Sequence, residues 1–342
     1  MTAISLKLRP AGTCDKVRPR VVQEYFPPGL PRVHLIDRES HGLHASPFVD
    51  QGDVLSLNLT QGCVQRCPFC SVRAHPSYAA GNEAIYLYQD TAERLDEELR
   101  GRRKLPRAVF ISPSTDPFPP LAAVQAETMR VVAVLAKHEI EAWLMTRGFI
   151  RPSAMKVLAS HRKWVKITVA LTTLERDLQR HLEPLCASPR MRLRQIAGLR
   201  GLGIPLQIAL EPLVPGLTDT REILAPLLEG LAKAGVRHVR TSYLFLRPAI
   251  HQNLMQALEP LGLAQLVLDA YSRGPILSAG TIAPARCLPK WTRQRGYATL
   301  MALAAEHGIT VSVCDTTNPD FRAPRPASPQ AASEIPLFSQ LA

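Results

Sequence analysis

The sequence contains no run of about 18 apolar residues, the length at which a transmembrane helix is suspected. Residues 1–20 lack the apolar segment behind a basic start that marks a secretory signal peptide. No short-period repeat is present beyond the alternation described below, so a repeat architecture is not expected. We therefore expect a soluble, cytoplasmic protein with no membrane partner.

Acidic residues are fewer than basic ones, 29 against 41, which gives a net charge of +12. A basic chain can be attracted to phosphate groups, as in nucleic acids. The basic residues are nevertheless dispersed over the chain, and an arginine-rich solvated surface gives the same count. The charge alone therefore does not distinguish a nucleic-acid partner from an ordinary surface.

The chain has seven cysteines, an odd number, so they cannot all pair in disulfides within one chain. In a cytosolic protein, clustered cysteines are more typical of metal binding or catalysis than of disulfides. The apolar fraction of 46% is sufficient for a folded core, and 342 residues suit one large α/β domain with extensions or two ordinary domains.

Apolar strand-like segments alternate with helical segments between residues 53 and 246. Alternation of this kind predicts parallel βαβ units. Pro152 is expected to open one helix, and Ser188 and Gly203 to begin and end another. The expected strands are 54–59, 107–112, 141–146, 165–171, 204–210 and 236–244. The expected helices are 91–100, 121–138, 152–160, 188–202 and 219–234.

We predict an α/β fold in which these units form a partial (β/α)6 TIM-like barrel with N- and C-terminal extensions. Active sites of such barrels lie at the carboxyl ends of the strands. The expected divisions are an N-terminal extension (1–50), the barrel (51–250), a helical extension that closes the barrel (251–317) and a mobile tail (318–342). Two helices (254–272 and 292–307) and a short strand (310–314) are expected in the helical extension.

Three cysteines, Cys63, Cys67 and Cys70, follow the first expected strand with the spacing C-x3-C-x2-C. Three thiolates within eight residues can hold one [4Fe-4S] cluster, and because a cluster normally takes four thiolates, one iron would stay open for another ligand. A structural zinc site is the alternative, and it needs four protein ligands. His75 or Cys14 could be the fourth, but the sequence has no second C-x2-C pair and no H-x3-H pair.

With Phe69 as the aromatic residue before its last cysteine, this motif resembles the signature of the radical S-adenosylmethionine superfamily. The resemblance implies that the open iron binds S-adenosyl-L-methionine (SAM), which is reductively cleaved to methionine and a 5′-deoxyadenosyl radical. This radical would then abstract hydrogen from a substrate. An external one-electron donor of flavodoxin or ferredoxin type is also implied.

Three later segments (114–118, 182–193 and 212–219) resemble, in order and spacing, the spore photoproduct lyase-like branch, also called DNA repair photolyase-like. The resemblance covers residues 53–246. It implies that residues near strand ends contact SAM. These are Ser114, Thr115, Arg147, Thr172, Leu210 and Glu211, together with Phe69.

Among them, Arg147 would meet the methionine carboxylate, and Leu210 and Glu211 would lie near the adenine. Each position also has a purely structural interpretation, such as a turn cap, a strand end or a surface ion pair. Asp116 is expected to cap a helix, and Glu183 to pair with Arg190 or Arg192.

The resemblance is incomplete at the residues that return hydrogen to the product. Spore photoproduct lyases place a donor cysteine just before the hydroxyl residue of the second strand, where this chain has Ser112 and Pro113. They also carry tyrosines beside the last two cluster cysteines, where this chain has Phe69 and Ser71. We therefore do not expect reversal of thymine dimers.

Four further cysteines, Cys14, Cys186, Cys287 and Cys314, stand singly, and isolated cysteines are usually small buried apolar residues. Cys314, at the end of an expected strand, is the candidate catalytic thiol for a radical relay.

Three hypotheses follow. The first is a radical SAM enzyme of lyase-like or transferase type with an unassigned substrate. The second is a radical SAM enzyme that acts on a nucleic-acid lesion or base. The third is a non-catalytic zinc-binding module.

Overall fold

The structure is a computed structural model of the full chain, and it describes residues 30–38, 42–45, 53–70, 72, 84–279, 282–314 and 317–321. Cys14, Ser71 and His75 lie outside the described residues, as do most of the predicted tail and much of the predicted N-terminal extension. No helix in the described ranges has the length and apolar character needed to cross a membrane.

The central element is an eight-stranded sheet with the strand order β13-β10-β9-β8-β7-β6-β3-β2. Seven of its strands pair in parallel, and only β2 at one edge is antiparallel. The six predicted strands are all present. They are β3 (Val54–Leu57), β6 (Ala108–Ile111), β7 (Glu141–Thr146), β8 (Val165–Ala170), β9 (Leu206–Leu213) and β10 (His238–Tyr243). The edge strands are β2 (His44–Ala45) and β13 (Thr310–Val313).

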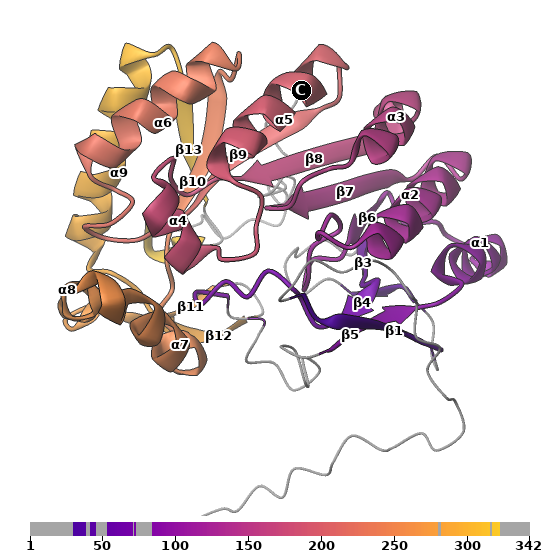
Figure 1. Cartoon of the computed structure of the whole chain (residues 1–342), viewed down its shortest axis with the longest axis horizontal. Helices are drawn as coiled ribbons and strands as arrows, with labels where there is room; N and C mark the ends of the chain where they lie inside the picture. Colours follow the sequence, from indigo (N-terminus) through magenta and orange to yellow (C-terminus); the bar gives the residue numbers. More distant parts are fainter. Residues whose placement is uncertain are drawn as a thin grey trace, which may run out of the picture.

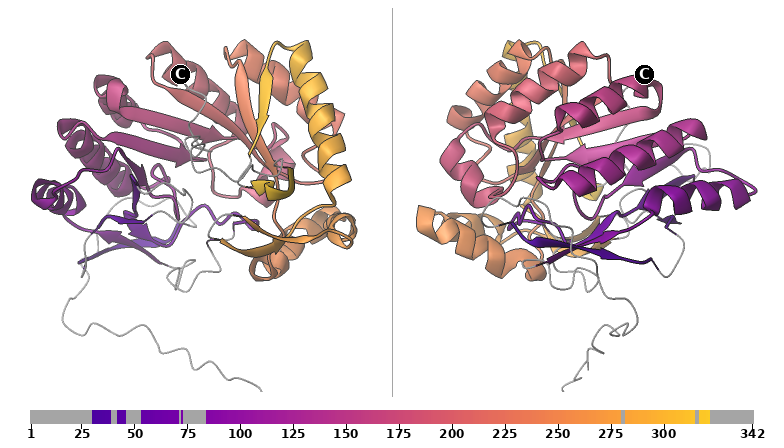
Figure 2. Two further views of the ribbon diagram at one scale, coloured as in Figure 1. Left: turned by 180° about the vertical axis from the view of Figure 1, so that it is seen from behind. Right: turned by 45° about the vertical axis from the view of Figure 1, so that its right-hand side comes forward.

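The helices between these strands cover one face of the sheet, which curves around its opposite face (Figures 1 and 2). The two edge strands are not paired with one another, so the described sheet is an open, partial barrel, which confirms the predicted fold class. The covering helices are α1 (Thr91–Gly101), α2 (Ala122–Lys137), α3 (Pro152–Ser160), α5 (Pro189–Gly201), α6 (Arg221–Lys233) and α9 (Lys290–Glu306).

Some elements differ from the sequence-based expectation. The single helix expected at 254–272 is divided into α7 (Pro248–Leu258) and α8 (Ala264–Tyr271), because Pro260 and Gly262 (φ +67°) interrupt it. A short helix, α4 (Arg176–Leu182), was not predicted. Neither was the antiparallel hairpin of β11 (Ile276–Ala279) and β12 (Ile282–Arg286).

A second, three-stranded sheet lies beside the barrel, and it was not predicted either. It has the order β1-β5-β4 and combines β1 (Arg32–Ile36) and β5 (Ala84–Tyr88) with the two-residue strand β4 (Thr60–Gln61). Because β4 immediately precedes the cysteine motif, this small sheet fixes the start of the loop that carries the motif.

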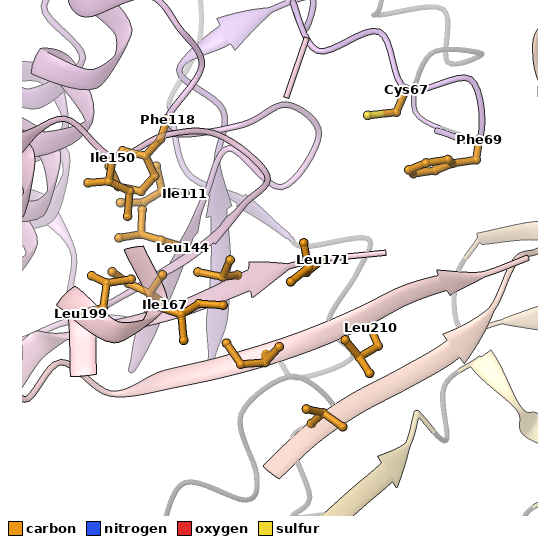
Figure 3. Close-up of a cluster of buried hydrophobic side chains, with 14 of the residues drawn as sticks. Cys67, Phe69, Ile111, Phe118, Leu144, Ile150, Ile167, Leu171, Leu199 and Leu210 are labelled. Atoms are coloured by element: carbon orange, nitrogen blue, oxygen red, sulfur yellow. The ribbon is translucent and has the colours of Figure 1, made fainter. Parts of the chain in front are cut away.

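The core lies between the parallel strands and the helices that cover them, and it is filled by branched aliphatic side chains (Figure 3). Ile111, Leu144 and Ile167 are fully buried on neighbouring strands, and each such side chain stabilises the fold by about 1.5–3 kcal/mol. Cys67 and Phe69 join this cluster from a loop beyond the strands (Figure 3). The core therefore extends up to the cysteine motif.

Candidate active site

A cavity of about 300 Å³ lies at the carboxyl ends of the parallel strands. Loops after β3, β6, β7 and β10, and the end of β9, contribute to its wall. Cys63, Cys67 and Cys70 all line it. In parallel α/β folds this edge is the usual place for a binding site, because the strand-end loops meet there.

The loop that carries the cysteines is held by hydrogen bonds at several points. Gln65 donates from Nε2 to Asp116 Oδ2 at 2.6 Å, and its carbonyl oxygen accepts the Leu185 N–H at 3.4 Å. Within the loop, the Cys70 N–H donates to the Cys67 carbonyl at 3.1 Å. These hydrogen bonds give the loop a defined shape at the edge of the cavity.

Asp116 is a fully satisfied carboxylate beneath this loop. Besides Gln65, it accepts hydrogen bonds from the Thr146 hydroxyl (2.7 Å) and from the N–H groups of Phe118 (2.7 Å) and Arg147 (2.8 Å). Burial raises its pKa, while these four donors oppose the rise. The expected role as a helix cap is wrong, because α2 begins at Ala122, several residues later. Asp116 instead joins the loops after β3, β6 and β7.

Gly148 follows in the loop after β7, and it allows the backbones of two loops to touch. A Cβ atom at this position would lie 1.8 Å from the carbonyl oxygen of Phe118. A side chain here would push the loop after β7 away from the loop after β6, and with it the neighbouring Arg147.

Ser114 and Thr115 both line the cavity, as the resemblance implied. The Ser114 N–H donates to Asn58 Oδ1 at 3.2 Å, and the Thr115 hydroxyl accepts from the Thr60 hydroxyl at 3.2 Å. Both hydroxyl residues are therefore tied to the segment between β3 and the cysteine motif. Ser112, before them, has a positive φ of 52° that turns the chain at the end of β6.

Arg147 lines the cavity in an ion-pair network rather than on the surface. It donates to Glu183 Oε1 at 2.6 Å and to the carbonyl oxygen of Glu211 at 2.8 Å, and its guanidinium lies 5.1 Å from the centre of the Phe69 ring. Burial lowers the pKa of Arg147, but Glu183, Cys67 and Cys186 outweigh this effect and raise it. Arg147 is therefore a permanent cation at the cavity wall.

Glu183 is completely buried and also pairs with Arg192, which donates in addition to the carbonyl of Ala170. The expected pairing of Glu183 with Arg192 is thus confirmed. Burial raises the pKa of Glu183, yet Arg192 and Arg147 lower it overall. One carboxylate shared by two guanidiniums leaves one positive charge in excess, and Arg147 is the member of the network that lines the cavity.

The other predicted residues divide into two groups. Phe69 and Glu211 line the cavity, and Glu211 pairs with Arg240 at 2.9 Å. Thr172, Leu210 and Cys314 are buried but do not line it. Leu210 lies within the aliphatic cluster on β9 (Figure 3).

Two residues that sequence reasoning missed lie at the site. Cys186 Sγ is 3.6 Å from Cys67 Sγ. Arg247 lines the cavity, and in the described part of the chain its Nε has no hydrogen-bond partner. Cys186 stands alone in the sequence, so its spacing carried no signal, whereas Arg247, a few residues after a predicted strand, lies where side chains of a barrel site are expected.

The donor set at the cavity fits an iron–sulfur cluster. Cys63, Cys67 and Cys70 form no disulfide and all line the cavity. Burial, together with Asp116, raises the pKa of the Cys63 thiol, so ligation would displace a proton. Among the described residues, no three His, Cys, Asp or Glu side chains converge closely enough to hold a single metal ion. Thiolates of a [4Fe-4S] cluster bind different irons and need not converge on one point, whereas zinc ligands must.

Comparison with known proteins gives a family and a fold. Residues 57–242 match the Radical SAM superfamily. An uncharacterized protein of Mycobacterium bovis is 26% identical over 232 residues, which cover 65% of this chain and 68% of the relative. An uncharacterized protein of the Acidianus two-tailed virus is 22% identical over 200 residues, which cover 55% of this chain and 66% of the relative.

Among solved structures, a spore photoproduct lyase complexed with dinucleoside spore photoproduct is similar, with a TM-score of 0.64, 12% identity and 82% of each chain covered. A mutant of spore photoproduct lyase with bound AdoMet and dinucleoside spore photoproduct gives a TM-score of 0.63 at 12% identity, over 82% of this chain and 81% of that one. At this identity the likeness concerns the fold, which is the fold that the sequence resemblance implied.

The buried charge network predicts a pH-dependent stability. Glu183→Gln should lower the free energy of unfolding at pH 7 by roughly 3–5 kcal/mol, because it leaves two buried guanidiniums without their carboxylate. The folded pKa of Glu183 lies below its ordinary value, so its stabilisation is present above the unfolded pKa, about 4.3, and is lost as the pH falls toward the folded pKa. Urea unfolding at several pH values measures this effect. Below about pH 5, the free energy of unfolding should fall less with falling pH in Glu183→Gln than in the wild type.

Glu229→Gln is the control, since the pair that Glu229 forms with Lys233 on α6 is exposed to solvent. Equal stability losses in the two variants would contradict the role given to the buried network.

Proposed function

The chain belongs to the Radical SAM superfamily and is a radical SAM enzyme, and we propose that Cys63, Cys67 and Cys70 hold a [4Fe-4S] cluster at which SAM is cleaved. The observation that carries this proposal is the cavity itself, since all three cysteines line it at the carboxyl edge of the sheet. The donor set contains only sulfur, which suits an iron–sulfur cluster.

When bound, the cluster and SAM would supply the electron transfer and the 5′-deoxyadenosyl radical that abstracts hydrogen from the substrate. The electron would come from an external donor of flavodoxin or ferredoxin type. The chain's own part is to bind, orient and exclude water. Phe69, in the cysteine loop and next to the Arg147 guanidinium, gives the cavity an apolar surface beside the cysteines.

Arg147 would bind the carboxylate of SAM. Its side chain is already oriented by Glu183 and by the carbonyl of Glu211, so little conformational freedom is lost when an anion arrives. The excess positive charge of the network makes an anionic group a favourable neighbour.

Ser114, Thr115 and Glu211 also line the cavity, and they would make the polar contacts to SAM. Thr172 and Leu210 lie behind the wall, so their part would be to support it rather than to touch SAM. Cys314 is buried outside the wall, which does not support a hydrogen relay through its thiol.

Cys67→Ala tests the assignment of the cluster. Anaerobically purified and reconstituted wild-type protein should contain about four irons per chain and form 5′-deoxyadenosine after reduction. Cys67→Ala should lose both iron and 5′-deoxyadenosine formation, because one of three protein ligands is removed. Iron analysis and chromatography of the products measure the two effects.

Cys287→Ala is the matched control, because Cys287 is also a buried free thiol but lies outside the cavity wall. It should retain the iron content of the wild type. A colourless wild-type protein with one zinc per chain would instead establish the zinc-binding module.

Arg147→Ala tests the binding of SAM separately from the cluster. Loss of a charge-assisted hydrogen bond should weaken SAM binding by roughly 10- to 100-fold, while the iron content stays unchanged. Isothermal titration of the reconstituted protein measures the affinity. Arg147→Lys keeps the charge opposite Glu183 and should show a smaller loss.

Arg130→Ala, on the exposed face of α2, provides the control for removal of an arginine. Unchanged SAM affinity in Arg147→Ala would show that the carboxylate is bound elsewhere.

A second candidate function is action on a nucleic-acid lesion or base. It is favoured by the cations on the cavity wall, Arg66, Arg147 and Arg247, and by the likeness in fold to a spore photoproduct lyase complexed with a dinucleoside photoproduct. Burial lowers the pKa of Arg247, and no carboxylate among the described residues pairs with it. A phosphate group would satisfy such a cation.

Binding of DNA and RNA oligonucleotides at rising salt concentration tests this candidate. Arg147 is assigned to SAM, so if Arg66 and Arg247 neutralise two phosphates, the affinity for DNA should fall roughly 12-fold between 50 and 200 mM salt. Arg247→Ala should weaken binding and reduce the magnitude of the slope by about one, whereas Arg130→Ala should not. Absent or salt-independent binding would remove nucleic acid as the substrate.

A further inference from the structure

Two thiols that are distant in sequence meet at the cluster loop. Cys186 Sγ lies 3.6 Å from Cys67 Sγ, although the two residues are 119 positions apart. Both are free cysteines. A separation of this size permits a hydrogen bond between a thiol and a sulfur acceptor, because sulfur is a large atom.

The position of Cys186 is fixed by its own loop, which follows α4. On one side of it the Leu185 N–H donates to the carbonyl of Gln65 in the cysteine loop, and on the other the Ala187 N–H donates to the carbonyl of Arg147 at 2.9 Å. The Cys186 N–H itself donates to the carbonyl of Glu183 at 3.2 Å. The loop is thus attached on both sides of Cys186 to segments that line the cavity.

We propose that Cys186 is a positioning residue for the cluster: its thiol donates a hydrogen bond to the sulfur of Cys67 and thereby raises the reduction potential of the cluster. This inference rests on the proposed function, since it presumes that Cys67 is a cluster ligand. The S–H bond stays intact throughout, and the single electron comes from the external donor.

The physical reason is charge. Reduction adds one negative charge to the cluster, and part of it resides on the ligand sulfurs, so a hydrogen-bond donor stabilises the reduced state more than the oxidised one. A cysteine that binds no metal carries its proton at neutral pH. Cys186 can therefore act as the donor once Cys67 has lost its own proton to the metal.

The geometry favours Cys186 as a hydrogen-bond donor over Cys186 as an additional ligand of the cluster. Two sulfurs 3.6 Å apart have about the spacing of two ligands on one metal ion, whereas thiolates on different irons of a cluster lie farther apart. No third His, Cys, Asp or Glu joins the pair closely enough in the part of the chain that the structure describes. A donor to Cys67 therefore accounts for the contact better than a ligand does.

Potentiometric titration of the reconstituted protein, followed by electron paramagnetic resonance of the reduced cluster, tests the proposal without recourse to enzymatic activity. Cys186→Ala should retain the iron content of the wild type but reduce its cluster less readily. At a fixed potential, the ratio of reduced to oxidised cluster should fall by up to about tenfold, which corresponds to 59 mV for one electron. Cys186→Ser keeps a donor and should lie between the alanine variant and the wild type.

Cys287→Ala is again the matched control and should have the wild-type potential. An unchanged potential in Cys186→Ala would overturn the proposal while leaving the cluster assignment intact. Loss of iron from Cys186→Ala to the extent seen for Cys67→Ala would also overturn it, because Cys186 would then be a ligand. Absence of a cluster from the wild-type protein would refute the proposed function itself, so the two failures are distinguishable.

Discussion

Four hydrogen bonds to one buried carboxylate, that of Asp116, hold together the loops on which the cavity depends. They come from the cysteine loop, from the loop after β6, and from the last residue of β7 and the loop that follows it. A buried carboxylate is tolerated only when its oxygens are fully satisfied, so each of these segments is required to stay in place. The rigidity of the cavity wall follows from this requirement.

A second buried carboxylate, that of Glu183, holds two arginine side chains in place. Glu183 lies between Arg147 and Arg192, and it fixes Arg147 at the wall while leaving one positive charge in excess. Together the two carboxylates give a cavity with apolar, cationic and sulfur-bearing sides. Such a combination suits a bound cofactor that has both an anionic end and a metal-binding end.

Much of the fold was predictable, because the buried parallel strands are short, apolar and separated by helices of normal length. The elements that were missed are those with weak periodicity. The hairpin of β11 and β12 and the short strands β1, β4 and β5 form through pairing with partners, and a local pattern does not show this. The break between α7 and α8 could have been predicted from Pro260 and Gly262.

The sequence by itself determined the cysteine motif, the alternation of strands and helices, and the edge of the sheet at which the site is expected, since spacing and alternation are local properties of a chain. Only the tertiary structure decided that Asp116 joins three loops, that Glu183 serves two arginines and that Cys186 meets Cys67. Those contacts join residues that are up to 119 positions apart, and no local pattern encodes which side chains a curved sheet brings together.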